Sequence, residues 1–169
     1  MRQRIEEELE RLHHGSSVTP TDRRGTVRFN VKLQGDPAEV LRKASTVLEI
    51  VDQKALDNWP SLDEWKSVLP AWFVAACASE MTPEEAQAWL ARWEKLDAEG
   101  RRAEEESKSW ALADWLYWMQ PDRRAWWWWD SRSNDGRQVA VEVDEWPFPW
   151  GSLAWVLKAA GATDVTPEE

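Results

Sequence analysis

The chain has 169 residues, 31% charged and 43% hydrophobic, which is the composition of a soluble globular protein and the length of one domain. Its formal net charge of -10 argues against binding to nucleic acid, whose phosphates require clustered Lys and Arg. The longest apolar run, Val68 to Ala78, is interrupted by Pro70 and is much shorter than a membrane span of ~20 residues, so no membrane partner is expected.

The acidic charge and the tryptophans lie in the same part of the chain. Residues 1–58 hold ten Lys/Arg and ten Asp/Glu, whereas residues 59–169 hold eleven basic residues, twenty-one acidic residues and all fifteen tryptophans. Surface tryptophans beside acidic groups indicate a recognition surface, because aromatic residues are enriched at binding hot spots. The alternative is that the negative charge only keeps an aromatic-rich chain soluble.

Few residues are suited to catalysis or metal binding. Cys77 is the only cysteine, so no internal disulfide can form, and a reducing, cytoplasmic location is predicted. The only histidines, His13 and His14, are adjacent and do not share a helix face as two metal ligands would. The seven glycines are scattered and form no phosphate-binding loop. We therefore expect no catalytic residue, no metal and no cofactor, and favour a protein that is not an enzyme.

The first third of the chain predicts two helices and a strand. Arg2 to His14 has apolar residues on one helical face, and residues 15–25 have the composition of an exposed linker. Residues 1–25 are therefore expected to form a loosely attached helical arm and linker. Residues 26–33 alternate apolar and polar side chains, which predicts a half-buried strand. Asp36-Pro37 then begins a helix that ends near Gln53.

The next segment predicts a short capped helix and a buried one. Ser61 to Glu64 has the spacing of a capping box, in which serine and glutamate bond each other's amides. Pro70 ends or kinks this helix. The apolar residues 71–78 that follow are typical of a central buried helix.

Two longer helices are predicted over residues 83–99 and 101–119. Thr82 and Pro83 begin the first of them. Trp89 and Trp93 share one of its faces, so both rings are expected in the core. The two helices are expected to form an antiparallel hairpin that packs on the sheet.

Four consecutive tryptophans, Trp126 to Trp129, precede Asp135-Gly136 and the alternating residues Val139 to Val143. An Asp-Gly pair between strand-like segments is a strong indication of a β-hairpin, here over residues 126–144. Arg123 and Arg124, just before the run, either stack on neighbouring rings or lie in a solvated loop.

The register of this hairpin stays open. A two-residue turn at Asp135-Gly136 pairs Trp128 with Val143 and places Trp126 and Trp128 on the valine face. A three-residue turn that includes Asn134 pairs Trp127 with Val143 and exchanges the faces.

A last helix is predicted from Leu153 to Ala160, capped by Ser152, with residues 166–169 as a tail. Together these elements predict a single α+β domain over residues 1–169. Its small antiparallel sheet, made of strand 26–33 and hairpin 126–144, is expected to be packed with several helices.

The candidate binding surface is the face of the hairpin opposite the valines, together with the segment that follows it. Its residues are Trp127, Trp129, Glu142, Asp144, Glu145, Trp146 and Trp150. Pro147 and Pro149 hold that segment extended. The alternative is that helices cover both faces and that the acids only surround the edge.

These observations predict a non-enzymatic, acidic, tryptophan-rich module that binds a protein partner with a basic surface. An inhibitor or immunity protein for a basic toxin is one instance, and the lysine-poor composition suits a bacterial gene. The alternative is a small-molecule protein or enzyme with an aromatic-walled pocket for a sugar or a cation. Carboxylates near tryptophans, such as Asp114 and Asp130, leave a catalytic pair open.

Overall fold

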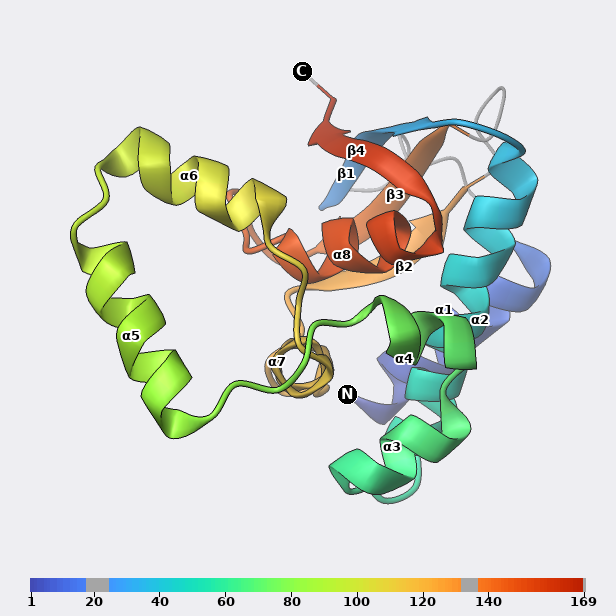
Figure 1. Ribbon diagram of the computed structural model, residues 1–169. Helices are drawn as coiled ribbons and strands as arrows, with labels where there is room; N and C mark the ends of the chain where they lie inside the picture. The colour runs from blue at the N-terminus through green and yellow to red at the C-terminus, as the bar shows by residue number, and fades with distance from the viewer. Residues whose placement is uncertain (18–24, 132–136, 169) are drawn as a thin grey trace.

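The computed structural model describes residues 1–17, 25–131 and 137–168, with the side chains of residues 105 and 106 excepted. This part of the chain has eight helices and one four-stranded antiparallel sheet with strand order β2-β3-β1-β4, which confirms the predicted α+β class (Figure 1). The strands are β1 (Thr26–Leu33), β2 (Trp126–Asp130), β3 (Gln138–Val143) and β4 (Ala162–Pro167). The helices are α1 (Arg2–His14), α2 (Pro37–Ala55), α3 (Leu62–Val68), α4 (Ala71–Ala76), α5 (Pro83–Glu94), α6 (Ala98–Ser107), α7 (Leu112–Met119) and α8 (Gly151–Ala160).

The main core lies between the sheet and helices α2, α7 and α8. Phe29 of β1 and Val141 of β3 are fully buried on this face, together with Trp126 and Trp128 of β2. The indole N–H of Trp126 donates a hydrogen bond to the Ser152 hydroxyl at 2.9 Å, which ties β2 to α8. The Ser152 side chain is therefore a hydrogen-bond partner in the core. The prediction that Ser152 caps the last helix is wrong, since Trp150 is the N-cap residue of α8.

Helix starts predicted from capping residues are confirmed at three helices. The Asp36 side chain caps α2, and the expected proline, Pro37, is the first residue of this helix. Reciprocal capping boxes begin α3 at Ser61 and Glu64, and α5 at Thr82 and Glu85. In the first box, hydrogen bonds from the Ser61 amide and hydroxyl lower the pKa of the Glu64 carboxyl.

The tryptophan hairpin forms, but in neither of the two registers considered. Trp126 pairs with Val143, and Trp128 pairs with Val141. Relative to a two-residue turn the pairing is displaced by two residues, so Trp126 and Trp128 still share the valine face. The register shifts again between Trp128 and Asp130, where β2 has an irregularity. The Asp135-Gly136 turn and Asn134 lie outside the described residues.

The fourth strand was not predicted, because residues 166–169 were interpreted as a tail. β4 pairs antiparallel with β1 along the edge of the sheet, with Val165 opposite Val31. Only Ala162 and Val165 of this strand are buried, so its sequence carries too little alternation to indicate a strand.

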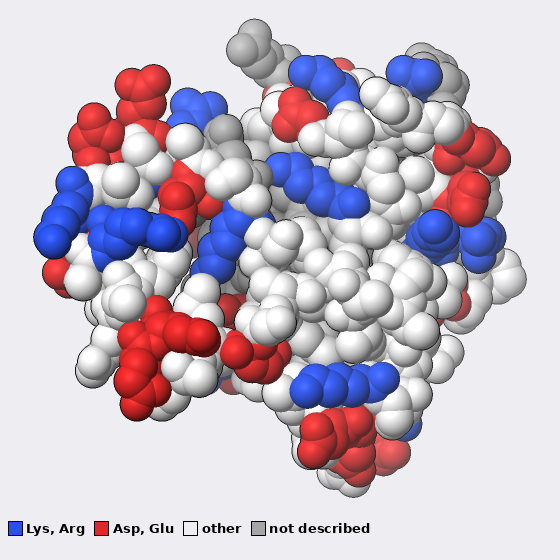
Figure 2. All heavy atoms as spheres, viewed as in Figure 1, with Lys and Arg blue, Asp and Glu red and all other residues white. Residues whose placement is uncertain are grey.

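The apolar segment that begins at Ala71 is not the expected central buried helix. α4 ends at Ala76, and Phe73 is its only buried residue, whereas Ala71 and Ala75 are exposed. Figure 2 shows few charged side chains at the centre of this face, over α4 and α8, and charged side chains around it. The helix buries Phe73, half-buries Trp72 and Val74, and leaves two alanines exposed, since alanine gains little from burial.

The predicted helices 83–99 and 101–119 also differ from the structure. The first ends at Glu94, and the second is interrupted between Ser107 and Leu112, so α5 and α6 form an extension that stands away from the sheet (Figure 1). None of the residues of α5 is buried. At the base of this α5–α6 extension, the Ala78 amide donates a hydrogen bond to the Trp110 carbonyl at 2.9 Å.

The two tryptophans of α5 are therefore not in the core, contrary to the prediction. Trp89 and Trp93 stack on each other with ring centroids 5.1 Å apart. Two cations lie over these rings, Lys108 at 4.4 Å from Trp89 and Arg101 at 5.9 Å from Trp93. Local ring stacking and cation–π contacts replace core burial for this pair.

Trp93→Ala is expected to lower the free energy of unfolding by no more than about 1 kcal/mol, because the ring is only half-buried. The matched substitution Trp115→Ala should cost roughly 3–5 kcal/mol, since Trp115 is fully buried and its indole N–H bonds the Ser152 carbonyl at 3.0 Å. Urea unfolding of both variants measures the difference. Equal losses would place Trp93 in the core.

Candidate functional site

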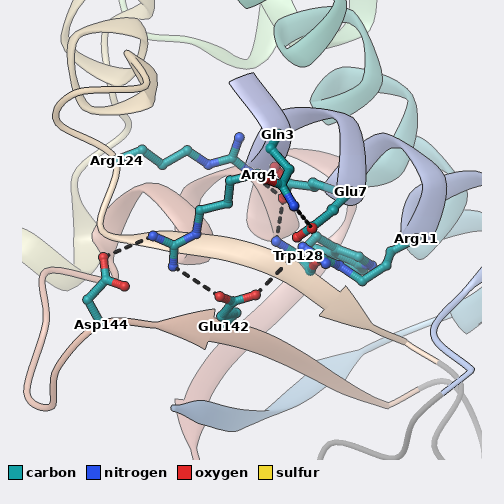
Figure 3. A network of polar contacts seen from close by, with 9 residues as sticks. Gln3, Arg4, Glu7, Arg11, Arg124, Trp128, Glu142 and Asp144 are labelled. Carbon is teal, nitrogen blue, oxygen red and sulfur yellow. Dashed lines mark hydrogen bonds and ion pairs between the residues drawn. The ribbon is translucent and has the colours of Figure 1, made fainter. Parts of the chain in front are cut away.

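Helix α1 covers the hairpin face that was predicted to bind a partner (Figure 3). Trp127 and Trp129 point to this face and are buried, Trp127 with only 1% of its surface exposed. The Arg4 guanidinium lies 5.1 Å from the Trp127 ring centroid, and that of Arg11 lies 4.8 Å from the Trp129 centroid. The expectation that these two rings reach the surface is wrong, and α1 is not the loosely attached arm predicted for residues 1–25.

A buried cluster of ionisable groups fixes α1 to the rest of the molecule. Arg124 donates hydrogen bonds to Glu8 of α1 at 2.7 Å and to Asp52 of α2 at 2.8 Å, and all three side chains are buried. The guanidinium also lies 4.6 Å from the ring centroids of Trp126 and Trp127. Of the two alternatives left open for Arg124, a solvated loop and stacking on neighbouring rings, the structure shows the second.

The electrostatics of this cluster follow from two carboxylates that share one guanidinium. Burial raises the pKa of the Asp52 carboxyl well above its ordinary value, and the nearby charge of Glu8 raises it further. Arg124 opposes both effects but does not cancel them. A single buried arginine thus binds both buried carboxyl groups, and its removal would leave them without a cation.

α1 also occupies the outer edge of the sheet at β2. The Trp128 amide donates a hydrogen bond to the Glu8 carboxylate, and the Trp128 carbonyl accepts one from Arg11 Nε at 2.9 Å. Backbone groups at a sheet edge otherwise invite pairing with another strand. One helix therefore buries two tryptophans and closes this edge.

Two of the predicted acidic site residues bind arginines of α1. Arg4 forms ion pairs with Asp144 at 3.0 Å and with Glu142 at 3.5 Å (Figure 3). Arg11 approaches Glu142 at 3.9 Å. The Glu142 side chain is only 15% exposed, whereas that of Asp144 remains 77% exposed. Glu142 therefore belongs to the contact with α1, and Asp144 lies at the border of the accessible surface.

The exposed part of the predicted site is the segment after β3. Asp144, Glu145 and Trp146 are exposed, and Trp146 is 53% exposed. Phe148 is buried and contacts both Phe29 and Trp146, with ring centroids 6.0 and 5.7 Å away. The segment is thus anchored to the core between its exposed residues.

Trp150, the last predicted site residue, is half-buried against Phe29, with ring centroids 5.5 Å apart. A Cβ built on Gly151 would lie 2.9 Å from the Trp110 ring, so the base of the α5–α6 extension packs against the start of α8. Trp150 therefore lies at the inner border of the exposed segment.

Sequence reasoning missed that Arg4, Glu8 and Arg11 contact the hairpin. It also missed that Arg124 binds two buried carboxylates as well as the tryptophan rings. The first three are spaced four and three residues apart on one helix face, which is the pattern of a helix face in contact. The sequence prediction for this helix considered only the apolar residues on its face, and not these charged ones. Glu8 and Arg124 are 116 residues apart in sequence, so no local pattern could have paired them.

Groups that could perform other chemistry are sparse in the described part of the chain. It holds no cluster of three or more potential metal ligands, and no helix in it is long and apolar enough to cross a membrane. Burial raises the pKa of the Cys77 thiol to about 11, which keeps it protonated near neutral pH. Two hollows of about 610 and 450 Å³ have no tryptophan in their walls, so neither has the character of the aromatic pocket considered above.

Comparisons with protein-family models, with curated proteins and with solved structures gave no match to this chain. The accessible surface at Asp144, Glu145 and Trp146 therefore has to be interpreted from its own chemistry.

Proposed function

We propose that the protein is a non-enzymatic binding module that docks on the basic surface of a protein partner. The contact surface consists of Asp144, Glu145, Trp146 and the adjoining residues 147–150. The observation that carries the proposal is the 53% exposure of Trp146 directly after two exposed carboxylates. The acids speed association with a basic surface, and the ring stabilises the complex once water is excluded from it.

The anchoring of residues 144–150 to the core favours a binding surface over a solvated loop without a role. Phe148 is buried between the exposed residues, and Pro147 and Pro149 restrict the backbone on either side of it. A segment ordered before binding loses less conformational entropy when the complex forms.

The two edges of the sheet favour contact through side chains over strand addition. Helix α1 covers the β2 edge at Trp128. At β4, the Val165 amide donates to the Asp164 side chain at 3.0 Å, and Pro167 has no N–H to donate. Both edges thus carry features that oppose pairing with a further strand.

An inhibitor or immunity protein that neutralises a basic toxin in the bacterial cytoplasm is a concrete instance of such a module. It needs no catalytic residue, and its net charge of -10 complements a basic enzyme. Fast, salt-dependent association is the kinetic property that this function requires.

The double variant Asp144→Asn/Glu145→Gln is expected to leave thermal stability nearly unchanged and to slow association with the basic partner. Glu142 is kept, because it pairs with Arg4 and Arg11. The effect should shrink as salt is raised, since rim charges act mainly on the association rate. Surface-immobilised wild-type protein recovers the partner, and stopped-flow mixing measures its association at 50 and 500 mM salt.

The control is Glu94→Gln/Asp122→Asn, which makes the same change of charge at two other exposed positions. It should slow association much less. If both double variants bind at the same rate, the proposed surface is not the docking site.

A further inference from the structure

Several tryptophan rings in this protein make cation–π contacts with a Lys or Arg side chain. Among the described residues, cations lie over the rings of Trp72, Trp89, Trp93, Trp126, Trp127 and Trp129. The pair of Arg4 and Trp127 is the most informative of these. Its guanidinium lies 5.1 Å from the ring centroid and also binds the carboxylates of Asp144 and Glu142. One ring and two carboxylates thus form a site for an arginine side chain.

The exposed segment presents a ring that holds no cation of the described residues, next to two exposed carboxylates, of which Asp144 also binds Arg4. Trp146 is the most exposed tryptophan of the described residues, and no described Lys or Arg lies over its ring. Its only ring contact in the described part is with Phe148, at 5.7 Å. Glu145 and Asp144, the two residues that precede Trp146, are both exposed. Arg4 binds Asp144 through Oδ2, yet that side chain remains 77% exposed.

We propose that Trp146, Glu145 and Asp144 form a binding site for an arginine side chain of the protein partner. This inference rests on the proposed function and names the group that the surface recognises. The guanidinium lies over the Trp146 ring while its N–H groups bind the carboxylates. Arg4 is the precedent, since it lies over Trp127, donates a hydrogen bond to Asp144 and forms an ion pair with Glu142.

Arginine fits this surface better than lysine for two reasons. Its planar guanidinium stacks on an aromatic ring and bonds a carboxylate through two N–H groups at once, whereas an ammonium is a compact, strongly hydrated charge. Guanidinium is also less costly to desolvate, which matters at a ring that loses water on binding.

The test uses three short peptides that differ only at two positions, which hold arginine, lysine or the uncharged arginine analogue citrulline. They are titrated into the full-length ¹⁵N-labelled protein, and the indole N–H resonances are followed by NMR. The Trp146 resonance is assigned from its loss in Trp146→Phe. Trp118, which is 41% exposed, provides a second surface indole as a control.

The arginine peptide is expected to shift the Trp146 resonance progressively and to leave Trp118 nearly unchanged. The lysine peptide should bind severalfold more weakly, and the citrulline peptide should give no saturable shift. Glu145→Gln should weaken the arginine peptide by roughly two- to fivefold, the range of one exposed ion pair.

Equal shifts with the arginine and lysine peptides would overturn the selectivity for arginine, and no shift with the arginine peptide would overturn the site. Either result leaves the proposed function standing if Asp144→Asn/Glu145→Gln still slows binding of the whole partner. If that variant binds the partner at the wild-type rate, the proposed function fails as well, and the two failures are thereby distinguished.

Discussion

Replacement of Arg124 by alanine is expected to lower the free energy of unfolding by roughly 3–5 kcal/mol, the cost of leaving a buried charge without its partner. Arg124 is the guanidinium that both Glu8 and Asp52 bind, at 2.7 and 2.8 Å. Without it, two buried carboxylates face each other. The same substitution removes a cation from the rings of Trp126 and Trp127.

The loss in Arg124→Ala should become smaller as the pH falls. The pKa of Asp52 is already raised in the folded protein, and the removal of Arg124 removes the main influence that lowers it. A carboxyl whose pKa is raised on folding binds a proton more readily in the native state, so stability increases as the pH falls through the folded pKa. Urea unfolding at pH 7 and pH 5 measures this change.

Arg123→Ala is the matched control for this prediction. Arg123 is exposed, lies 4.2 Å from the Tyr117 ring centroid and donates a hydrogen bond to the Tyr117 hydroxyl at 2.5 Å. Its removal should cost less than about 1 kcal/mol and show little dependence on pH. Comparable losses in the two variants would contradict the structural role assigned to Arg124.

The features predicted correctly from sequence depend on residues that are close together in the chain. Asp36, Ser61 and Thr82 begin helices because their side chains bond amides two or three residues away. The alternation of β1 likewise reflects a half-buried sheet surface. Such local patterns identified most helix starts and three of the four strands.

The features that sequence reasoning missed depend on contacts between distant segments. The spacing of Trp89 and Trp93 is compatible with two structures. One is a helix that buries both rings in the core, and the other is an extension in which nearby cations cover the rings, as observed. The burial of α1 requires Arg124, which follows it by more than a hundred residues. Apolar periodicity gives the face of a helix, but it does not identify what covers that face.

The candidate site was predicted in part for the same reason. Alternation along β2 left open which tryptophans lie opposite the valines, and the candidate site assumed that Trp127 and Trp129 do. The structure places these two rings on that face, but the helix that covers them was not foreseen. Asp144, Glu145 and Trp146 follow the end of β3, where alternation and cover both cease. The exposure of these three side chains was therefore easier to predict than that of the side chains on β2.

Trp127→Ala is expected to lower the free energy of unfolding by roughly 3–5 kcal/mol, as for other large aromatic side chains removed from a core. The Trp127 ring is buried, and the guanidinium groups of Arg4 and Arg124 lie 5.1 and 4.6 Å from its centroid. Its removal leaves a cavity beneath α1 and Arg4 without its ring, while Arg124 keeps the ring of Trp126.

Trp146→Ala should show the opposite pattern, with a loss of stability below about 1 kcal/mol and a large loss of affinity for the partner. Affinity of the folded fraction, measured by calorimetry at a temperature where both variants remain native, separates the two roles. Trp127→Ala should then bind the partner with nearly wild-type affinity, because α1 keeps that face from solvent. A Trp127→Ala variant that stays fully stable but no longer binds would show that α1 leaves the hairpin when the partner docks, and that the covered face is the true contact surface.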